Sequence, residues 1–243
     1  MIPLKANIPR HTPALVTWVI FLGNVLVFFW QLRLPTAYQT ALIYHYGLVP
    51  ARLSDRTWAI MSGYTSSGVE TFFTYMFLHG SIWHFALNMW VLWIFARNIE
   101  DVLGHTRFAL FYLGTGIAAS ILHFIVDPLS TSPIIGASGA IAGVMGAYMR
   151  LFPHARVVTL IPIFIFPWIV EVPALLFLGI WFFIQIASGF AEWASTGQSG
   201  GGVAWWAHVG GFAAGWLLIF VFSRGRPCRY CYIADRKHYE KTT

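Results

Sequence analysis

Serine, histidine and asparagine side chains interrupt stretches of this chain that are otherwise strongly apolar. They are His79, His84 and Asn88 in HGSIWHFALN, Ser138 in GASGA, and His208 in WWAHVGG. Polar side chains within apolar spans are costly and usually face the protein interior, where they mark functional sites. A serine with an imidazole base and hydrogen-bond donors for a developing oxyanion is the set of groups that nucleophilic acyl transfer needs.

The composition identifies the class of protein that must hold these residues. The chain is 58% hydrophobic and 10% charged, with a mean hydropathy of +0.66, whereas an average soluble domain has roughly 25% charged residues. We therefore expect a multi-pass membrane protein in contact with a lipid bilayer. No nucleic-acid-binding motif is visible, and we attribute the net charge of +6 to membrane topology and anionic lipid head groups.

Apolar runs predict an all-α bundle of six transmembrane helices. Crossing about 30 Å of hydrocarbon takes roughly 20 residues, and only the fourth run is short. The expected spans are residues 13–34, 80–103, 107–127, 137–152, 172–191 and 203–223. The long outer loop at 35–70 is amphipathic, and we expect it to lie partly in the membrane.

Basic residues fix the orientation of these spans. With the N-terminus inside, only Arg33, Arg52 and Arg56 of the 15 Lys and Arg residues fall outside, as the positive-inside rule requires. We expect cytoplasmic tails at 1–12 and 224–243 around one domain at 13–223, in a bacterial-type cell inner membrane.

The three polar motifs fall at one depth of such a bundle. The second, fourth and sixth spans run from outside to inside, so His84, Asn88, Ser138 and His208 all lie in the outer third of the membrane at about 1.5 Å of rise per residue. Small residues at short spacing let two membrane helices approach closely. They line the fourth and sixth spans: Gly136, Gly139, Ala142, Gly143, Gly146, Ala147, Ala207, Gly211 and Gly215.

These positions predict a catalytic Ser–His dyad. His208 would take the proton of Ser138 and return it to the leaving amine, while the Ser138 N–H, His84 and Asn88 would stabilise the oxyanion. No carboxylate is placed to orient the histidine. We expect no metal and no cofactor, and reduced or lipid-modified thiols in the CRYC motif of the C-terminal tail.

The three motifs together resemble those of the rhomboid intramembrane serine proteases. The match comprises HxxxxHxxxN ending at Asn88, GxSG around Ser138, and AHxxGxxxG from Ala207, with the Glu100–Gly104 end of the second span similar as well. The resemblance covers residues 13–223. It implies that Ser138 is the nucleophile and His208 the base, that His84 and Asn88 stabilise the oxyanion, and that single-pass or multi-pass membrane proteins are cleaved within transmembrane segments near the outer face.

One position departs from that pattern. Some family members carry an aromatic residue four positions after the serine, packed on the catalytic imidazole, and this chain has Ala142 there. We expect another group, such as Trp205 or Trp206, to orient His208. A hinge at Gly200–Gly202 with a mobile fifth span is our hypothesis for how water reaches Ser138.

Other interpretations of the same residues exist. His84 and Asn88 can bridge helices, Ser138 can cap a helix, and we expect His79 to serve structure rather than chemistry. A small-solute transporter would spread polar residues across the bilayer. A non-catalytic rhomboid-like binding factor would be expected to have lost the serine or the histidine, and both remain. The substrate and the oligomeric state do not follow from the sequence.

Overall fold

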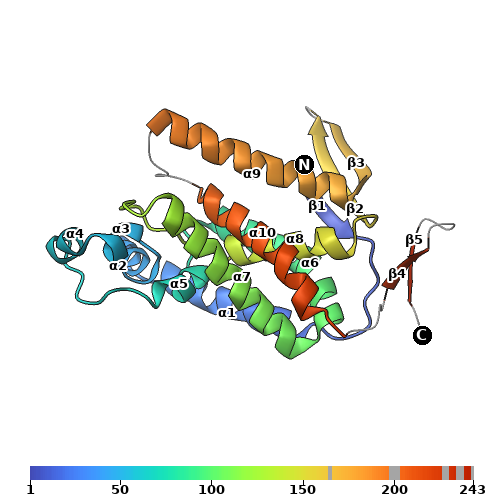
Figure 1. The fold of residues 1–243 in the computed structure, drawn as a ribbon, viewed down its shortest axis with the longest axis horizontal. Coiled ribbons are helices and arrows are strands. Elements are labelled where there is room, and N and C mark those ends of the chain that lie inside the picture. The colour runs from blue at the N-terminus through green and yellow to red at the C-terminus, as the bar shows by residue number, and fades with distance from the viewer. Residues whose placement is uncertain (164–165, 197–202, 226–229, 234–237, 242–243) are drawn as a thin grey trace.

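The computed structural model describes residues 1–163, 166–196, 203–225, 230–233 and 238–241. The chain is mostly helical (Figure 1). Its elements are β1 Ile2–Ala6, α1 Leu15–Leu32, α2 Thr36–Tyr46, α3 Pro50–Ser54, α4 Arg56–Met61, α5 Thr71–Thr74, the 3-10 helix η1 Tyr75–Phe77, α6 Ile82–Leu103, α7 His105–Val126, α8 Ser138–Leu151, β2 Arg156–Ile163, β3 Phe166–Pro173, α9 Ala174–Thr196, α10 Trp205–Phe222, β4 Tyr230–Ile233 and β5 His238–Lys241.

Each of the six apolar runs contains a helix. Within the described residues, four helices are long and apolar enough to cross a membrane: α1, α7, α9 and α10. Helix α6 is 22 residues long, and α8 has only 14 residues. Most of α8 is buried, and it packs against α6, α7 and α10. Helix α9 lies along one side of this group, at the top of Figure 1.

Glycines bring α8 and α10 into backbone contact, as the small-residue spacing predicted. A β-carbon on Gly211 would lie 2.0 Å from the carbonyl oxygen of Gly139, and one on Gly215 would lie 1.9 Å from that of Gly143. These separations are far shorter than a van der Waals contact. Glycine is therefore required at both positions for the two helices to approach as they do.

Two carboxylates at the end of α6 hold the beginning of α1. Glu100 accepts hydrogen bonds from the backbone N–H groups of Val16 and Thr17, both at 2.8 Å. Asp101 accepts from the backbone N–H of Thr12 at 3.1 Å. Because the first N–H groups of a helix have no acceptor within it, buried acids at this place stabilise the helix end.

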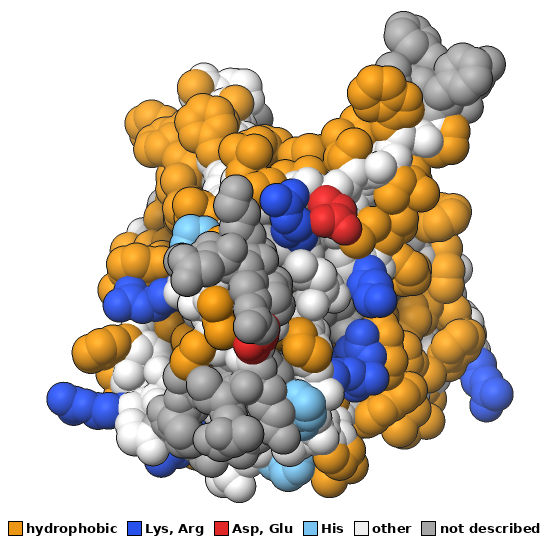
Figure 2. Space-filling view, turned by 90° about the vertical axis from the view of Figure 1, so that its right-hand side faces the viewer, with side chains coloured by type: hydrophobic (Ala, Val, Ile, Leu, Met, Phe, Trp, Pro, Cys, Tyr) orange, Lys and Arg blue, Asp and Glu red, His pale blue; other side chains and the backbone are white. Residues whose placement is uncertain are grey.

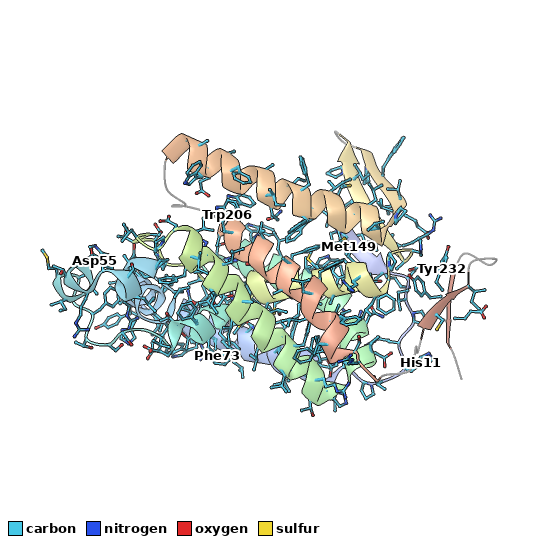
Figure 3. All side chains as sticks on the ribbon, viewed as in Figure 1. His11, Asp55, Phe73, Met149, Trp206 and Tyr232 are labelled. Carbon is cyan, nitrogen blue, oxygen red and sulfur yellow. The ribbon has the colours of Figure 1, made fainter. Side chains whose placement is uncertain are left out.

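The segment at 35–70 is folded rather than extended, and α2, α3 and α4 lie within it. Arg52 is 3% exposed. Its Nη1 donates to the carbonyl of His45 at 2.7 Å and its Nη2 to Ser66 Oγ at 2.6 Å. Figure 3 shows Asp55, from this segment, and Tyr232, from β4, at opposite ends of the molecule.

Strands correct the expectation of an all-α chain. β1, β2 and β3 form an antiparallel sheet in that order, with Ile2 opposite Leu160 and Val157 opposite Val172. β4 and β5 pair in the C-terminal tail. The run from 156 to 173 is rich in β-branched residues, which favour strands. Because this run is also strongly apolar, the sequence did not distinguish its strands from the neighbouring helical spans.

Basic side chains lie on the face at the strand end of the molecule. Figure 2 views this end directly and shows Lys and Arg side chains, with hydrophobic side chains gathered along both flanks. This is the arrangement expected at a membrane surface.

One expectation for the C-terminal tail was wrong: Cys231 is disulfide-bonded rather than reduced. Cys228 and the Gly200–Gly202 hinge lie outside the described residues.

Candidate functional site

A cavity of about 740 Å³ lies among α6, α8, α9 and α10. Its lining includes all four residues expected to carry the chemistry: His84, Asn88, Ser138 and His208. Apolar side chains of α9, including Phe177 and Trp181, cover another side. The cavity therefore combines a few polar groups with largely apolar walls, as ligand-binding sites usually do.

Ser138 and His208 are in direct hydrogen-bond contact. Ser138 Oγ lies 2.8 Å from His208 Nε2, although the two residues are 70 positions apart in the sequence. Ser138 is the first residue of α8 and His208 lies in the first turn of α10. The glycine contacts between these two helices hold the two side chains together. Because Ser138 begins a helix, its backbone N–H has no acceptor within α8.

His84 and Asn88 face the backbone just before Ser138. They are four residues apart on α6 and share one face of it. A β-carbon on Gly136 would lie 2.6 Å from His84 Nε2 and 3.5 Å from Asn88 Nδ2. Asn88 Nδ2 is buried and has no hydrogen-bond partner among the described residues. A buried donor of this kind needs an explanation.

Gly136 has the conformation that this arrangement requires. Its φ is +113°, a region that residues with a side chain rarely adopt. Its N–H donates to the carbonyl of Tyr75 at 2.8 Å. This hydrogen bond to η1 fixes the turn that leads into α8. The side of Gly136 where a β-carbon would stand lies against His84.

The side chain of His79 does not line the cavity, and its ring lies 5.1 Å from that of His84. Its side chain is fully buried, and its ring centroid lies 5.4 Å from that of Phe85, at right angles to it. Gln31 Nε2 donates to its carbonyl oxygen at 2.8 Å. Burial, with His84 nearby, lowers the pKa of His79 to about 3, so the ring is neutral at neutral pH. These contacts agree with the structural role expected from the sequence.

His208 makes a second polar contact, which the sequence did not predict. Gln185 on α9 is 4% exposed, and its Oε1 lies 2.8 Å from His208 Nδ1. The signal was present, because Gln185 is a polar residue in the middle of the apolar fifth span.

Aromatic residues surround the same imidazole in an unexpected way. The ring of Trp181 on α9 lies 5.8 Å from that of His208, tilted by 36°. Trp205 makes a perpendicular contact at 6.3 Å. Trp206 instead packs on Phe190 of α9, with ring centroids 5.1 Å apart, and lies between α9 and α10 (Figure 3). Of the two tryptophans expected to orient His208, only Trp205 contacts it.

Comparison with known proteins gives the family. The sequence model of the rhomboid domain matches residues 66–225, which is more than half of the chain. The chain belongs to the rhomboid family. With its four membrane-span candidates, this rhomboid is an integral membrane protein.

Curated relatives of this rhomboid come from mitochondria and from a bacterium. It is 32% identical over 156 residues to "Rhomboid protein 1, mitochondrial" of Saccharomyces cerevisiae, covering 61% of this chain and 40% of the relative. It is 36% identical over 93 residues to human "Presenilin-associated rhomboid-like protein, mitochondrial", covering 37% and 24%. It is 38% identical over 76 residues to "Putative rhomboid protease YdcA" of Bacillus subtilis, covering 31% and 38%.

The matched regions are parts of these relatives rather than their whole length. The chain spans 40% of the yeast relative and less of the other two. The family assignment therefore applies to the matched domain at residues 66–225, which contains Ser138 and His208.

Proposed function

We propose that this rhomboid is an intramembrane serine endopeptidase that cleaves transmembrane segments of membrane proteins near the outer face of the bilayer. The observation that carries the proposal is the 2.8 Å contact between Ser138 Oγ and His208 Nε2, made in a cavity that His84 and Asn88 also line. Serine needs an adjacent base to act as a nucleophile at neutral pH. An imidazole at hydrogen-bond distance is such a base.

The reaction follows from the positions of these groups. Ser138 Oγ attacks the carbonyl carbon of the scissile peptide while its proton passes to His208 Nε2. The oxyanion that forms accepts hydrogen bonds from the Ser138 N–H, from Asn88 Nδ2 and from His84. His208 then protonates the leaving nitrogen, the C–N bond breaks, and an acyl ester remains on Ser138. Water, deprotonated by His208, hydrolyses this ester and restores the serine.

The proposed membrane arrangement has six spans, formed by α1, α6, α7, α8, α9 and α10, within a domain at 13–223. Helix α8, at about 1.5 Å per residue, is roughly 21 Å long, shorter than the hydrocarbon core of about 30 Å. Its burial among other helices suits a span that meets protein rather than lipid. The basic residues of both tails support their placement in the cytoplasm of a cell whose inner membrane holds the protein, whereas a disulfide at Cys231 is uncommon in that compartment.

Cleavage by purified protein tests this function. Wild type in detergent is incubated with a generic transmembrane substrate beside Ser138→Ala and His208→Ala. We expect cleavage by wild type and near-complete loss in both variants. A wild type that binds the substrate without cutting it would instead favour a non-catalytic binding factor, and equal cleavage by Ser138→Ala would reject the nucleophile.

The side on which fragments appear tests the proposed orientation. Substrate carrying a reporter on its outer end is expressed with the protease in cells, and medium or periplasm is compared with cytoplasm. We expect the reporter fragment on the outer side, because the site lies near that end of the spans. Release into the cytoplasm alone would contradict the topology.

A further inference from the structure

Gln185 makes two hydrogen bonds that together determine which nitrogen of His208 carries the proton. Its side-chain Nε2 lies 3.0 Å from the backbone carbonyl of Trp181, one turn earlier on α9. Its Oε1 lies 2.8 Å from His208 Nδ1. Gln185 is 4% exposed, so both bonds are shielded from competing water. A backbone carbonyl only accepts hydrogen bonds, so the NH₂ end of the amide must face Trp181.

The tautomer of His208 follows from this orientation. With the NH₂ end committed to Trp181, the end that faces His208 is a carbonyl oxygen, which has no hydrogen to donate. The proton of this contact must therefore be on Nδ1. A neutral imidazole with its proton on Nδ1 has a lone pair on Nε2, and Nε2 is the atom that faces Ser138 Oγ at 2.8 Å. Ser138 then donates to His208.

We infer that Gln185 is a positioning residue that holds His208 in the tautomer able to deprotonate Ser138. This inference rests on the proposed function. Gln185 acts through His208 and does not line the cavity where substrate would lie. A neutral amide performs this orientation without placing a further charge in an apolar interior, where charge is costly.

The position of Gln185 gives α9 control over the reactive geometry. Trp181 and Gln185 are four residues apart, share one face of α9, and both contact His208. Phe182 of the same helix stacks on Phe212 of α10, with centroids 4.4 Å apart and planes within 17°. Any movement of α9 away from α10 would therefore remove the acceptor from Nδ1 along with the packing, and leave His208 free to change tautomer.

A matched set of variants separates this role from simple packing. Gln185→Met keeps the length of the side chain and removes the acceptor. Gln185→Glu, as the neutral carboxylic acid, can reproduce both hydrogen bonds. Ile184→Met changes a neighbouring side chain of α9 that is 48% exposed and serves as the control. Cleavage kinetics and thermal stability in detergent are measured for wild type and each variant.

We expect Gln185→Met to lower kcat about tenfold, the effect of losing one hydrogen bond, with KM and the unfolding temperature nearly unchanged. Gln185→Glu should recover most of the lost kcat, and Ile184→Met should match wild type. Wild-type kcat in Gln185→Met would overturn the inference. An equal deficit in Gln185→Glu would also overturn it, because an acceptor restored at His208 Nδ1 would then fail to restore turnover.

A direct measurement on the wild-type protein does not depend on how the variants fold. Protein labelled with ¹⁵N-histidine is examined by NMR in detergent at neutral pH, and the His208 signals are assigned by their loss in His208→Ala. The inference requires a hydrogen on Nδ1 and none on Nε2. The opposite tautomer would overturn it. Failure of the proposed function is a separate result, since it would appear as absent cleavage by wild type whatever the tautomer.

Discussion

His84 lies directly against Gly136, so closely that a β-carbon on residue 136 would stand 2.6 Å from its Nε2. The glycine therefore serves both the turn into α8 and the placement of a side chain from α6. With φ at +113°, it also holds a conformation that other residues adopt only with strain. The positive φ and the close contact with His84 are thus both found at Gly136, two residues before Ser138. The proposed oxyanion would form next to Ser138.

Replacing Gly136 should damage the site. We expect Gly136→Ala to lower kcat by about a hundredfold, the cost of losing one oxyanion donor, because the added methyl group displaces His84. Cleavage of a transmembrane substrate measures this loss. Gly114→Ala is the matched control, since a β-carbon there meets nothing within 4 Å. Full activity of Gly136→Ala would show that turnover does not depend on the position that His84 has against Gly136.

The contact between α8 and α10 should be equally sensitive at Gly215. A β-carbon there would lie 1.9 Å from the Gly143 carbonyl oxygen, and the helices would have to separate. We expect Gly215→Ala to destabilise the protein by about 1–3 kcal/mol, lowering the unfolding temperature in detergent by several degrees. Gly179→Ala, with open space around it inside α9, should not lower that temperature, because alanine is the better helix former. A stable Gly215→Ala would contradict the described packing.

Asn88 should contribute to turnover more than to substrate binding. Its buried Nδ2 has no partner among the described residues, and we assign it to the oxyanion, which exists only during reaction. Asn88→Ala should therefore lower kcat by about a hundredfold with little change in KM. Asn24→Ala makes the same change at a buried asparagine of α1; we expect it to affect stability but not kcat. A rise in KM alone in Asn88→Ala would assign Asn88 to binding.

His79 should make stability depend on pH. Its pKa is lowered to about 3 in the folded protein, against about 6.5 for a free histidine. Below pH 6.5 the unfolded chain binds a proton that the folded protein does not, so stability falls as pH decreases toward 3. His79→Leu should reduce this fall in the unfolding temperature relative to wild type. Identical pH dependence in the two proteins would mean that His79 becomes protonated in the fold.

The sequence predicted which polar residues lie together better than it predicted their surroundings. Ser138, His208, His84 and Asn88 were singled out because each is a polar group in an apolar run, and all four line one cavity. The glycine spacing correctly predicted the contact of α8 with α10. These signals are local or periodic, and they can be read from a single chain.

The contacts from α9 could not be predicted in the same way. Gln185 is visible in the sequence, but its contact with His208 depends on the rotation of α9 about its own axis. That rotation is set by contacts such as Phe182 on Phe212. The sheet of β1, β2 and β3 was missed for a related reason, because its pairing joins residues as far apart as Ile2 and Leu160.

Covalent labelling of Ser138 tests the central claim most directly. Purified protein in detergent is treated with a fluorophosphonate, which reacts with activated serines, and the modified residue is identified by mass spectrometry. We predict one adduct, on Ser138, in wild type, and a strongly reduced rate in His208→Ala. Modification of another serine instead, or an undiminished rate on Ser138 without the imidazole of His208, would contradict the account.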